Sequence, residues 1–201
     1  MALENKLGIE DAAELARVEE RISKRNALKL FASGRLEKFP PGKFATLAEI
    51  HRALFGEIYD FAGKIRTVNL AKGHFRFAAA LYLKEALAQV ENMPQNNFAA
   101  IVEKYVEMNV AHPFREGNGR SMRLWLDHIF KAELGRVVDW SRVDKAEYLS
   151  AMELSPIHDD KIKKILAAAL TDKINDREIF MKGIDASYFY ENYFTYRTCE
   201  L

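Results

Sequence analysis

One stretch of this chain decides its fold, and it reads HPFREGNGRSMR at residues 112–123. It joins two segments, residues 98–111 and 121–134, in which apolar residues recur with the spacing of a helix. Asn97 is a suitable N-cap for the first segment, and Gly135 is suited to end the second. A stretch between two apolar helices is expected to be a loop at the edge of a buried core rather than a solvated linker.

Helical patterns also cover most of the remaining chain, so the predicted fold class is all-α. The other predicted helices cover residues 11–33, 46–55, 79–93, 144–155, 159–170 and 175–182. Two of these helices begin with capping signals, Thr46 followed by Glu49 and Asp144 followed by Glu147. The first helix and the proline-rich connector after it form an N-terminal unit over residues 11–45.

Residues 63–77, GKIRTVNLAKGHFRF, depart from this helical pattern. Short alternating apolar runs on either side of Lys72-Gly73 predict a small β-hairpin. Because a two-stranded hairpin is marginal in water by itself, it must lean on the helical body, where it is a candidate flap over a site. The alternative is that these residues form only a surface loop.

Composition and charge narrow the class of protein. The chain has 201 residues, of which 49% are apolar, so we expect one globular domain over residues 1–201. The net charge of +1 provides no basic field for nucleic acid or for a membrane surface. No apolar run reaches the roughly 20 residues that span a bilayer, and no apolar signal segment is seen, so we expect a cytoplasmic protein. The single cysteine, Cys199, forms no internal disulfide, and the histidines lack the spacing of zinc ligands.

The side chains of the loop HPFREGNGRSMR are of the types that phosphate chemistry requires. Gly117-Asn118-Gly119 lets the backbone turn its N–H groups outward where a helix begins, which favours an anion such as phosphate. Arg120 and Arg123 are suited to bidentate contacts with phosphate. Glu116 next to an anion would be repelled unless a cation lies between them, and Mg²⁺ bridging carboxylate and phosphate resolves this conflict. His112 is the nearby side chain that can accept a proton at neutral pH.

Together, these residues indicate phosphoryl or nucleotidyl transfer from a nucleotide. Taken singly, each has a structural alternative, because a lone histidine is often structural and Gly-Asn-Gly is a common turn.

The same loop resembles the signature of the Fic family, H-P-F-x-[D/E]-G-N-G-R-x-x-R, at every specified position. Gly63-Lys64-Ile65-Arg66 matches the Gly-x-x-Arg element that precedes this signature in the family, and the resemblance extends from Thr46 to the C-terminus. It implies a Fic-type helical bundle with a small β-hairpin flap over the active site, and Phe114 would anchor the loop in the core. It also implies a protein adenylyltransferase, which moves AMP from ATP to a hydroxyl of a target protein and releases pyrophosphate.

The resemblance gives each motif residue a role. His112 would deprotonate the target hydroxyl, and Glu116 would hold Mg²⁺ between the α- and β-phosphates of ATP. Gly117-Asn118-Gly119 would form the anion hole. Arg120 would contact phosphate, and Arg123 would hold the γ-phosphate.

In the family, the hairpin aligns the backbone of the target protein by strand-like pairing. The segment 66–77 matches that flap, and the target-docking residues would be Lys72, Gly73, His74 and Phe75. The implied partners are ATP and a bacterial target protein, and a homo-oligomer is also compatible with the sequence.

The C-terminal end is rich in tyrosine and resembles a second element of the family. Four of the eight tyrosines lie in the last fourteen residues of the chain, Tyr188, Tyr190, Tyr193 and Tyr196. Such a concentration of aromatic residues indicates that this end docks on the body. The segment from Ser187 to Asn192, SYFYEN, resembles the inhibitory motif [S/T]-x-x-x-E-[G/N], on a helix predicted over residues 185–196.

This second resemblance implies auto-inhibition. Glu191 would pair with Arg123 and displace the γ-phosphate, as in the compact class of the family that carries its own C-terminal inhibitory helix. We expect Tyr188 or Tyr190 to be self-modified once the segment loosens. The alternative is an aromatic helix that only closes the core.

Two alternatives to adenylyl transfer stay open at the level of sequence. The same fold could perform another transfer, with a different nucleotide or with phosphocholine, or could remove AMP. The chain could also be a nucleotide-sensing binding module without significant catalysis, although binding alone does not require His112 as a base.

Overall fold

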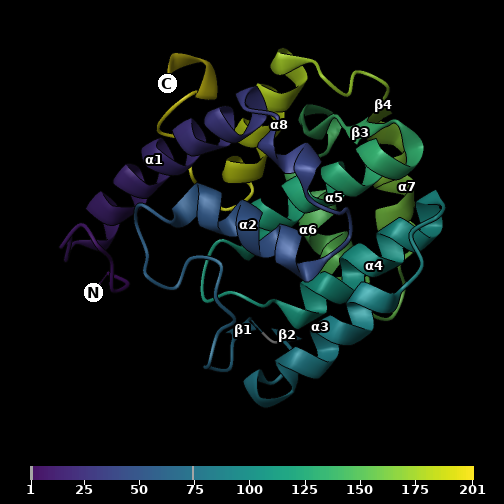
Figure 1. The fold of residues 1–201 in the computed structure, drawn as a ribbon, viewed down its shortest axis with the longest axis horizontal. Helices are drawn as coiled ribbons and strands as arrows, with labels where there is room; N and C mark the ends of the chain where they lie inside the picture. Colours follow the sequence, from purple (N-terminus) through teal and green to yellow (C-terminus); the bar gives the residue numbers. More distant parts are fainter. Residues whose placement is uncertain (1, 74) are drawn as a thin grey trace.

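The structure is a computed structural model, and it describes residues 2–73 and 75–201. Within these ranges the chain forms a helical body with two small two-stranded sheets at its edges (Figure 1). The α-helices are α1 (Ala12–Ala32), α2 (Phe44–Phe55), α3 (Leu83–Asn92), α4 (Phe98–Ala111), α5 (Asn118–Leu134), α6 (Lys145–Leu154), α7 (Asp160–Ala169) and α8 (Arg177–Phe189). The strands are β1 (Ala71–Lys72), β2 (Phe75–Arg76), β3 (Val137–Val138) and β4 (Leu170–Thr171). The predicted all-α class with a small hairpin is confirmed.

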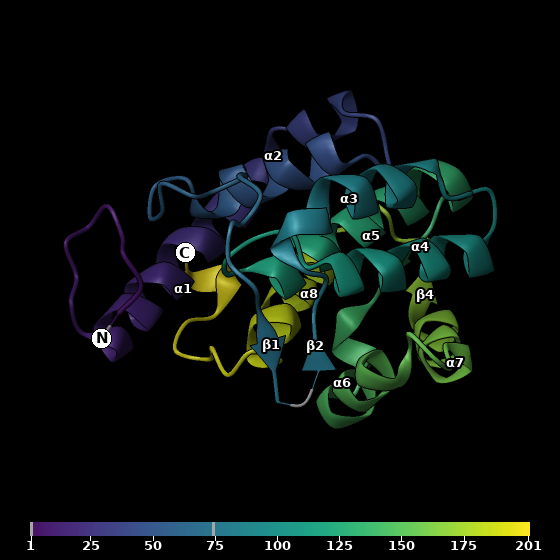
Figure 2. The same cartoon turned by 90° about the horizontal axis from the view of Figure 1, so that it is seen from below.

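Helix α5 lies at the centre of the body and packs against α2, α4 and α8 (Figures 1 and 2). Its apolar side chains are enclosed on more than one face, as expected of a helix surrounded by others, and they include Trp125, Leu126, Ile129 and Phe130. Burying each such side chain stabilises the fold by about 1.5–3 kcal/mol. No helix among the described residues has both the length and the apolar character needed to cross a membrane.

Helix α2 begins at Phe44, and the capping box predicted at Thr46 and Glu49 is wrong. The Phe44 N–H donates to a carboxylate oxygen of Glu91, on α3, over 2.7 Å. The Thr46 hydroxyl donates to the carbonyl of Pro40. A partner distant in sequence therefore caps α2, and no local pattern reveals it.

Local signals do set other helix ends. Asn97 caps α4 and Asp144 caps α6 through their side chains, as predicted. Helix α5 begins at Asn118, before the predicted Ser121, because Gly117 has a left-handed φ of 74° that turns the loop straight into the helix.

The hairpin is shorter than the predicted residues 63–77. Residues 71–72 pair antiparallel with residues 75–76, on the side of the molecule that faces the C-terminal segment (Figure 2). The pairing does not extend before Leu70, and the Val68 carbonyl accepts a bond from Arg66 over 2.6 Å instead. The second sheet, β3 with β4, is absent from the sequence prediction, since strands of two residues carry no alternating pattern.

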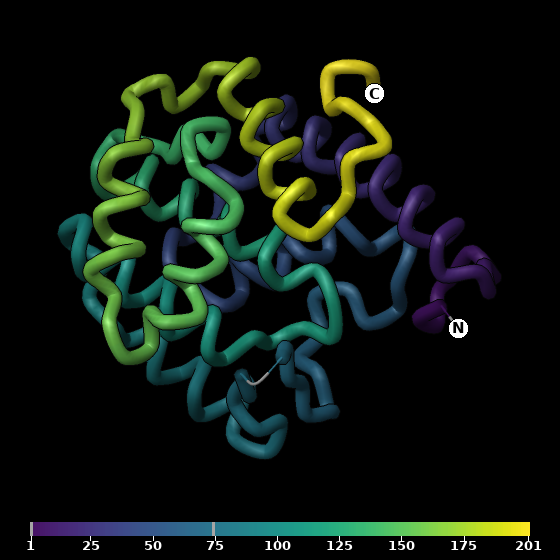
Figure 3. The backbone as a smooth tube through the Cα atoms, turned by 180° about the vertical axis from the view of Figure 1, so that it is seen from behind, coloured from purple at the N-terminus to yellow at the C-terminus, as the bar shows by residue number. Residues whose placement is uncertain are grey.

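The C-terminal end forms one long helix, α8, where the sequence predicts two. The predicted inhibitory helix over residues 185–196 is wrong in its extent, because α8 ends within it. Asn192 has a left-handed φ of 67°, and the chain then runs back along α1 (Figure 3). The N–H groups of Thr195 and Tyr196 donate to the carboxylate of Glu20 on α1, which holds the chain in a non-helical path.

Candidate active site

A cavity of about 720 Å³ lies between the hairpin, the motif loop (residues 112–119) and the C-terminal segment. The predicted site residues that line it are Lys72, Gly73, Phe75, His112, Glu116, Gly117, Asn118, Gly119, Arg123, Tyr190, Glu191 and Asn192. Helix α6 contributes Tyr148, Leu149 and Met152. The fold therefore brings together three segments that the sequence analysis singled out separately.

His112 ends helix α4 and faces this cavity. Its backbone is left-handed, with φ 48° and ψ 63°, so the helix stops and the motif loop begins at this residue. The ring Nδ1 lies 3.3 Å from the carbonyl of Asn109, and the ring stacks on Phe77. Burial lowers the pKa of His112 to about 4. The imidazole is therefore neutral at pH 7 and can accept a proton.

Arg66, from the predicted upstream element, ties the end of α4 to the hairpin. Its side chain is buried, and Nε donates to the carbonyl of His112 over 2.8 Å. The two terminal nitrogens donate to the carbonyls of Val68, Ala78 and Ala111. Bonds from a charged donor are stronger than neutral ones, so one arginine fixes the backbone of His112 relative to the flap.

Buried side chains anchor the motif loop to the core of the protein. Phe114 is fully buried, as the resemblance implies, and the Asn118 side chain bonds to both its N–H and its carbonyl over 2.8 Å. His51, on α2, donates from Nε2 to the carbonyl of Glu116 over 2.8 Å, and its Nδ1 accepts the Gly63 N–H. Burial lowers the pKa of His51 to about 3, so the neutral ring keeps both bonds at pH 7. His51 thus positions the loop, a role that the sequence analysis missed.

The start of α5 offers backbone N–H groups to an anion. A Cβ on Gly117 would lie 2.5 Å from the ring of Phe55, so glycine is needed at this turn. The N–H groups of Asn118 and Gly119 have no acceptor within the helix, and the positive end of the helix dipole lies at the same place. A Cβ on Gly119 would lie 2.4 Å from a carboxylate oxygen of Glu191. The Glu191 carboxylate therefore covers this anion site.

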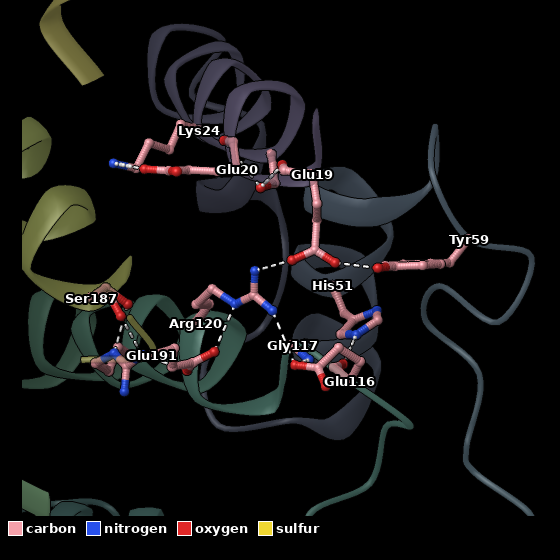
Figure 4. A network of polar contacts seen from close by, with 12 residues as sticks. Glu19, Glu20, Lys24, His51, Tyr59, Glu116, Gly117, Arg120, Ser187 and Glu191 are labelled. Carbon is pink, nitrogen blue, oxygen red and sulfur yellow. Dashed lines mark hydrogen bonds and ion pairs between the residues drawn. The ribbon is translucent and has the colours of Figure 1, made fainter. Parts of the chain in front are cut away.

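Arg120 lies behind the wall of the cavity with three carboxylates around it (Figure 4). Its fully buried guanidinium pairs with Glu19 on α1, with Glu116 over 3.1 Å and with Glu191 over 2.9 Å. Burial opposes the charge of Arg120, but Glu19 and Glu191 outweigh it and raise this pKa. Glu19 also accepts the hydroxyl of Tyr59. A phosphate can reach Arg120 only in exchange for one of these carboxylates.

Arg123 is held by α8 and by the turn after it. Its Nε donates to the hydroxyl of Ser187 over 2.6 Å, and its Nη2 donates to the Ser187 carbonyl and to Glu191 Oε1, both over 2.8 Å. Burial would raise the pKa of Glu191, but Arg120 and Arg123 outweigh it and hold this pKa below its ordinary value. The Glu191–Arg123 pair that the resemblance implies is therefore present, with Glu191 ionised at neutral pH.

Residues 42–130 match the Fic/DOC family. These residues form a Fic/DOC domain. The chain is 32% identical over 196 residues to protein adenylyltransferase VbhT of Bartonella schoenbuchensis, an alignment that covers 90% of this chain and 40% of that protein. It is 28% identical over 152 residues to the probable protein adenylyltransferase Fic of Salmonella typhimurium, covering 70% of this chain and 73% of that protein. This chain thus spans less than half the length of VbhT and most of the length of the Salmonella protein.

Solved structures of Fic proteins share the fold. BepC from Bartonella tribocorum, solved with bound AMPPNP, superposes with a TM-score of 0.71 at 23% identity, over 85% of this chain and 93% of that chain. The N-terminal Fic domain of a Bartonella quintana effector, solved with bound ADP, gives a TM-score of 0.71 at 24% identity, over 89% and 93%. At these identities the likeness concerns the fold alone.

In this Fic/DOC chain, a lysine on α6 holds the turn that carries Glu191. Lys145 Nζ donates to the carbonyl of Phe189 over 2.9 Å and to the side-chain oxygen of Asn192 over 2.7 Å. Of the predicted inhibitory residues, Asn192 thus contacts the lysine that holds the turn, and Ser187 contacts Arg123.

A lysine on α1 ties the segments on either side of this turn, and Figure 4 shows its side chain beside Glu20. Lys24 is 1% exposed and pairs with Glu20 over 3.0 Å. Its Nζ also donates to Asp185 on α8 over 3.0 Å and to the carbonyl of Tyr196 over 2.6 Å. The segments before and after Glu191 are therefore both tied to α1. The sequence analysis missed this cluster, because charged residues on a helix are usually solvated.

The predicted docking residues lie on the hairpin of this Fic/DOC chain. Lys72 and Gly73 are exposed, and Phe75 is half-buried. His74, the fourth predicted docking residue, lies outside the described residues. The three described residues share one cavity with the Fic motif.

The two tyrosines expected to be self-modified are buried in this state. The Tyr188 side chain is fully enclosed, and no hydrogen bond within residues 2–73 and 75–201 reaches its hydroxyl. The Tyr190 hydroxyl donates to the carbonyl of Val143 over 2.7 Å. Self-modification of either tyrosine would therefore require this segment to move.

Glu116 is the motif residue that fits a metal ion. Its side chain is 39% exposed and lines the cavity, while Oε1 accepts bonds from the Gly117 N–H and from Arg120. Mg²⁺ takes oxygen ligands and keeps several waters, so one carboxylate beside a phosphate site suits it. The described part of the chain has no cluster of three or more His, Cys, Asp or Glu side chains that could hold a metal by itself. Magnesium at this place would depend on phosphate oxygens as well as on Glu116.

Proposed function

We propose that this chain is an auto-inhibited protein adenylyltransferase that moves AMP from ATP to a hydroxyl side chain of a target protein. The observation that carries the proposal is the cavity, which collects the neutral His112, the Glu116 carboxylate, the open helix start at Gly117-Asn118-Gly119, and Arg123. Membership of the Fic/DOC family and the names of the curated relatives support it. The reaction takes place in the cytoplasm, where ATP is available.

In the active state the triphosphate of ATP binds at the start of α5, where free N–H groups and the helix dipole favour negative charge. His112 Nε2 accepts the proton of the target hydroxyl, whose oxygen bonds to the α-phosphorus. The bond from the α-phosphorus to the bridging oxygen breaks, and pyrophosphate leaves with that oxygen. Glu116 would hold Mg²⁺, which when bound neutralises charge on the α- and β-phosphates. Arg123 holds the γ-phosphate and stabilises the leaving pyrophosphate.

In the resting state Glu191 takes the place of the γ-phosphate, so that ATP binds in a pose that cannot react. The ion pairs of its two carboxylate oxygens with Arg120 and Arg123 support this proposal, as does its position over the start of α5. Release of the turn frees Arg123 and exposes Tyr188 and Tyr190, one of which becomes a substrate of the enzyme itself.

The hairpin docks the target protein. Its short exposed strands leave backbone groups on their outer edges for pairing with an extended segment of the target. Lys72, Gly73 and Phe75 lie beside the motif in the same cavity, which supports this role.

Transfer of a label from the α-phosphate of ATP tests the proposal. The native chain and the Glu191→Gly variant are incubated with a bacterial lysate and labelled ATP, with Mg²⁺ or with EDTA. We expect strong protein labelling with the variant, weak labelling with the native chain, and none with EDTA or with ATP labelled at the γ-phosphate. Mass spectrometry then identifies the modified hydroxyl.

Two outcomes of this experiment would contradict adenylyl transfer. Retention of ATP without label on any protein would indicate a nucleotide-sensing binding module. Transfer from another nucleotide but not from ATP would indicate a different Fic-type reaction.

A further inference from the structure

The ring of Phe77 covers one face of the His112 imidazole. The two ring centroids lie 3.6 Å apart and the ring planes are inclined by 16°, which is face-to-face contact at van der Waals distance. Phe77 follows β2, and its N–H donates to the carbonyl of Leu70 over 3.2 Å. It therefore extends the pairing of the hairpin by one step, at the point where the hairpin meets the helical body.

Hydrogen bonds do little to set the orientation of this imidazole. The distance from Nδ1 to the Asn109 carbonyl is 3.3 Å, longer than a usual hydrogen bond. No hydrogen bond within residues 2–73 and 75–201 reaches Nε2 of His112. Because the terminal torsion of a histidine side chain has broad minima, a contact on the ring face decides the plane of the ring.

The backbones that carry the two rings are fixed to each other. Arg66 donates to the carbonyls of His112 and Ala78, over 2.8 Å and 2.5 Å. The Ala78 N–H donates to the carbonyl of Val110 over 2.9 Å. The stack between Phe77 and His112 therefore rests on a rigid frame and does not depend on a flexible loop.

We propose that Phe77 is a positioning residue for proton transfer: its ring fixes the plane of the His112 imidazole, so that Nε2 presents its lone pair to the target hydroxyl. This inference rests on the proposed function, in which His112 is the base. Since Phe77 is continuous with the hairpin strands, a target segment that pairs with the hairpin binds next to the residue that orients the base. ATP is held at the opposite wall of the cavity, by the start of α5 and Arg123.

Nuclear magnetic resonance of the full chain with ¹³C-labelled histidine tests the stack without reference to activity. The ring current of Phe77 shifts the imidazole C–H signals of His112 upfield of those of the exposed His158, and His112→Ala assigns these signals. We expect Phe77→Leu to remove the upfield shift and Phe77→Tyr to keep it. Signals of His112 that stay unchanged in Phe77→Leu would overturn the inference, whether or not the chain is an adenylyltransferase.

Kinetics of AMP transfer test the consequence of the stack. A displacement of a reacting group by about 1 Å costs on the order of 10²-fold in rate, so Phe77→Leu should lower kcat by about that factor and leave KM for ATP unchanged. Phe77→Tyr, which keeps the ring face, should restore kcat. Phe98→Leu is a matched control, because the Phe98 ring stacks on Phe130 with centroids 5.6 Å apart and lies outside the cavity.

Three kinetic results would overturn the inference. These are a native kcat in Phe77→Leu, a loss of ATP affinity as large as the loss of kcat, and an equal loss of kcat in Phe98→Leu. Absence of AMP transfer in every variant would instead contradict the proposed function, and the resonance experiment would still decide whether Phe77 orients His112.

Discussion

The two walls of the cavity are built in opposite ways. On the wall formed by the motif loop and α5, Arg120 and Arg123 are buried and paired with charged partners, and Asn118 closes the loop on itself. The opposite wall is a hairpin of two residue pairs, 71–72 with 75–76, whose side chains are mostly exposed. The role proposed for the first wall depends on which side chains are present. The role proposed for the second wall depends on the direction in which its backbone N–H and C=O groups point. Substitutions should therefore have large effects on the first wall and small ones at the four strand positions of the second, in contrast to Phe77, whose side chain contacts His112.

The largest expected effect is at His112, on the first wall. A positioned general base contributes about 10²–10⁴-fold to the rate, so His112→Ala should lower AMP transfer by that range. Binding of ATP should change little, because the triphosphate binds at the start of α5. Transfer is measured with α-labelled ATP and binding by calorimetry, with the exposed His158→Ala as the control. Undiminished transfer by His112→Ala would remove His112 from the mechanism.

A rise in activity is expected at Glu191, on the turn after α8, which pairs with Arg123 of this wall. Coupling between sites is typically about 1–3 kcal/mol, or roughly 5–150-fold, so Glu191→Gln should raise AMP transfer within or above this range. Glutamine keeps the shape of the side chain and removes its charge, so the effect reports the ion pairs with Arg120 and Arg123. Initial rates over a range of enzyme concentrations measure it, and Glu200→Gln on the surface is the matched control. Equal rates for the native chain and Glu191→Gln would contradict auto-inhibition.

The pH dependence of the Glu191→Gly variant should reflect the buried base. Burial lowers the pKa of His112 to about 4, Arg66 and Lys72 lower it too, and Glu191 raises it. The imidazole of His112 therefore stays neutral, and able to accept a proton, as the pH falls. Removal of Glu191 lowers the pKa of His112 further, so it does not make the ring protonate at a higher pH. We expect kcat to stay flat from about pH 8 down to about pH 5.5, where an ordinary histidine with a pKa of about 6.5 would lose about tenfold. A tenfold fall across this interval would contradict the depressed pKa.

The smallest effects are expected on the hairpin wall. Ala71 and Arg76 face each other between two bonded pairs of an antiparallel ladder, so their N–H groups point outward to a docking partner. Proline at whichever of these two positions pairs with the target removes its N–H group, and with it one hydrogen bond to the target. Such a bond is worth about 0.5–1.5 kcal/mol, or roughly 2–12-fold in target labelling. Lys72→Ala, which keeps the backbone, should change labelling by less than about twofold. Target labelling that is normal in both Ala71→Pro and Arg76→Pro, with unchanged ATP binding, would mean that the hairpin is not the docking edge.

The same contrast between the walls explains which parts of the site could be predicted from the sequence. Residues 112–123 are contiguous, so their chemistry and their place at a helix start could be predicted from the amino-acid pattern alone. Their partners Glu19 and His51 come from distant helices, and Tyr59, which donates to Glu19, comes from the loop after α2. Buried charge or imidazole on a helix has no local signature. The Glu191–Arg123 pair could be predicted only through the resemblance to the Fic family.

The predicted hairpin and the predicted inhibitory helix are both too long, and for the same physical reason. Local alternation predicts a hairpin over residues 63–77, but Arg66 removes a carbonyl from the pairing that this alternation favours. The resemblance predicts an inhibitory helix that reaches residue 196, but Glu20 takes up the N–H groups of Thr195 and Tyr196 in a non-helical path. In both cases a side chain takes up backbone groups that the local pattern assigns to regular structure.

In the proposed resting state, the contacts on both sides of Glu191 make its carboxylate a competitor of ATP that is carried on the same chain. Even short flexible tethers give effective concentrations in the mM range, and a turn held by Lys24 and Lys145 is more confined than such a tether. Dilution of the protein should therefore leave the proposed block intact. In the proposed activation the γ-phosphate replaces the Glu191 carboxylate on Arg123, so this buried guanidinium has an anionic partner both before and after the turn is released.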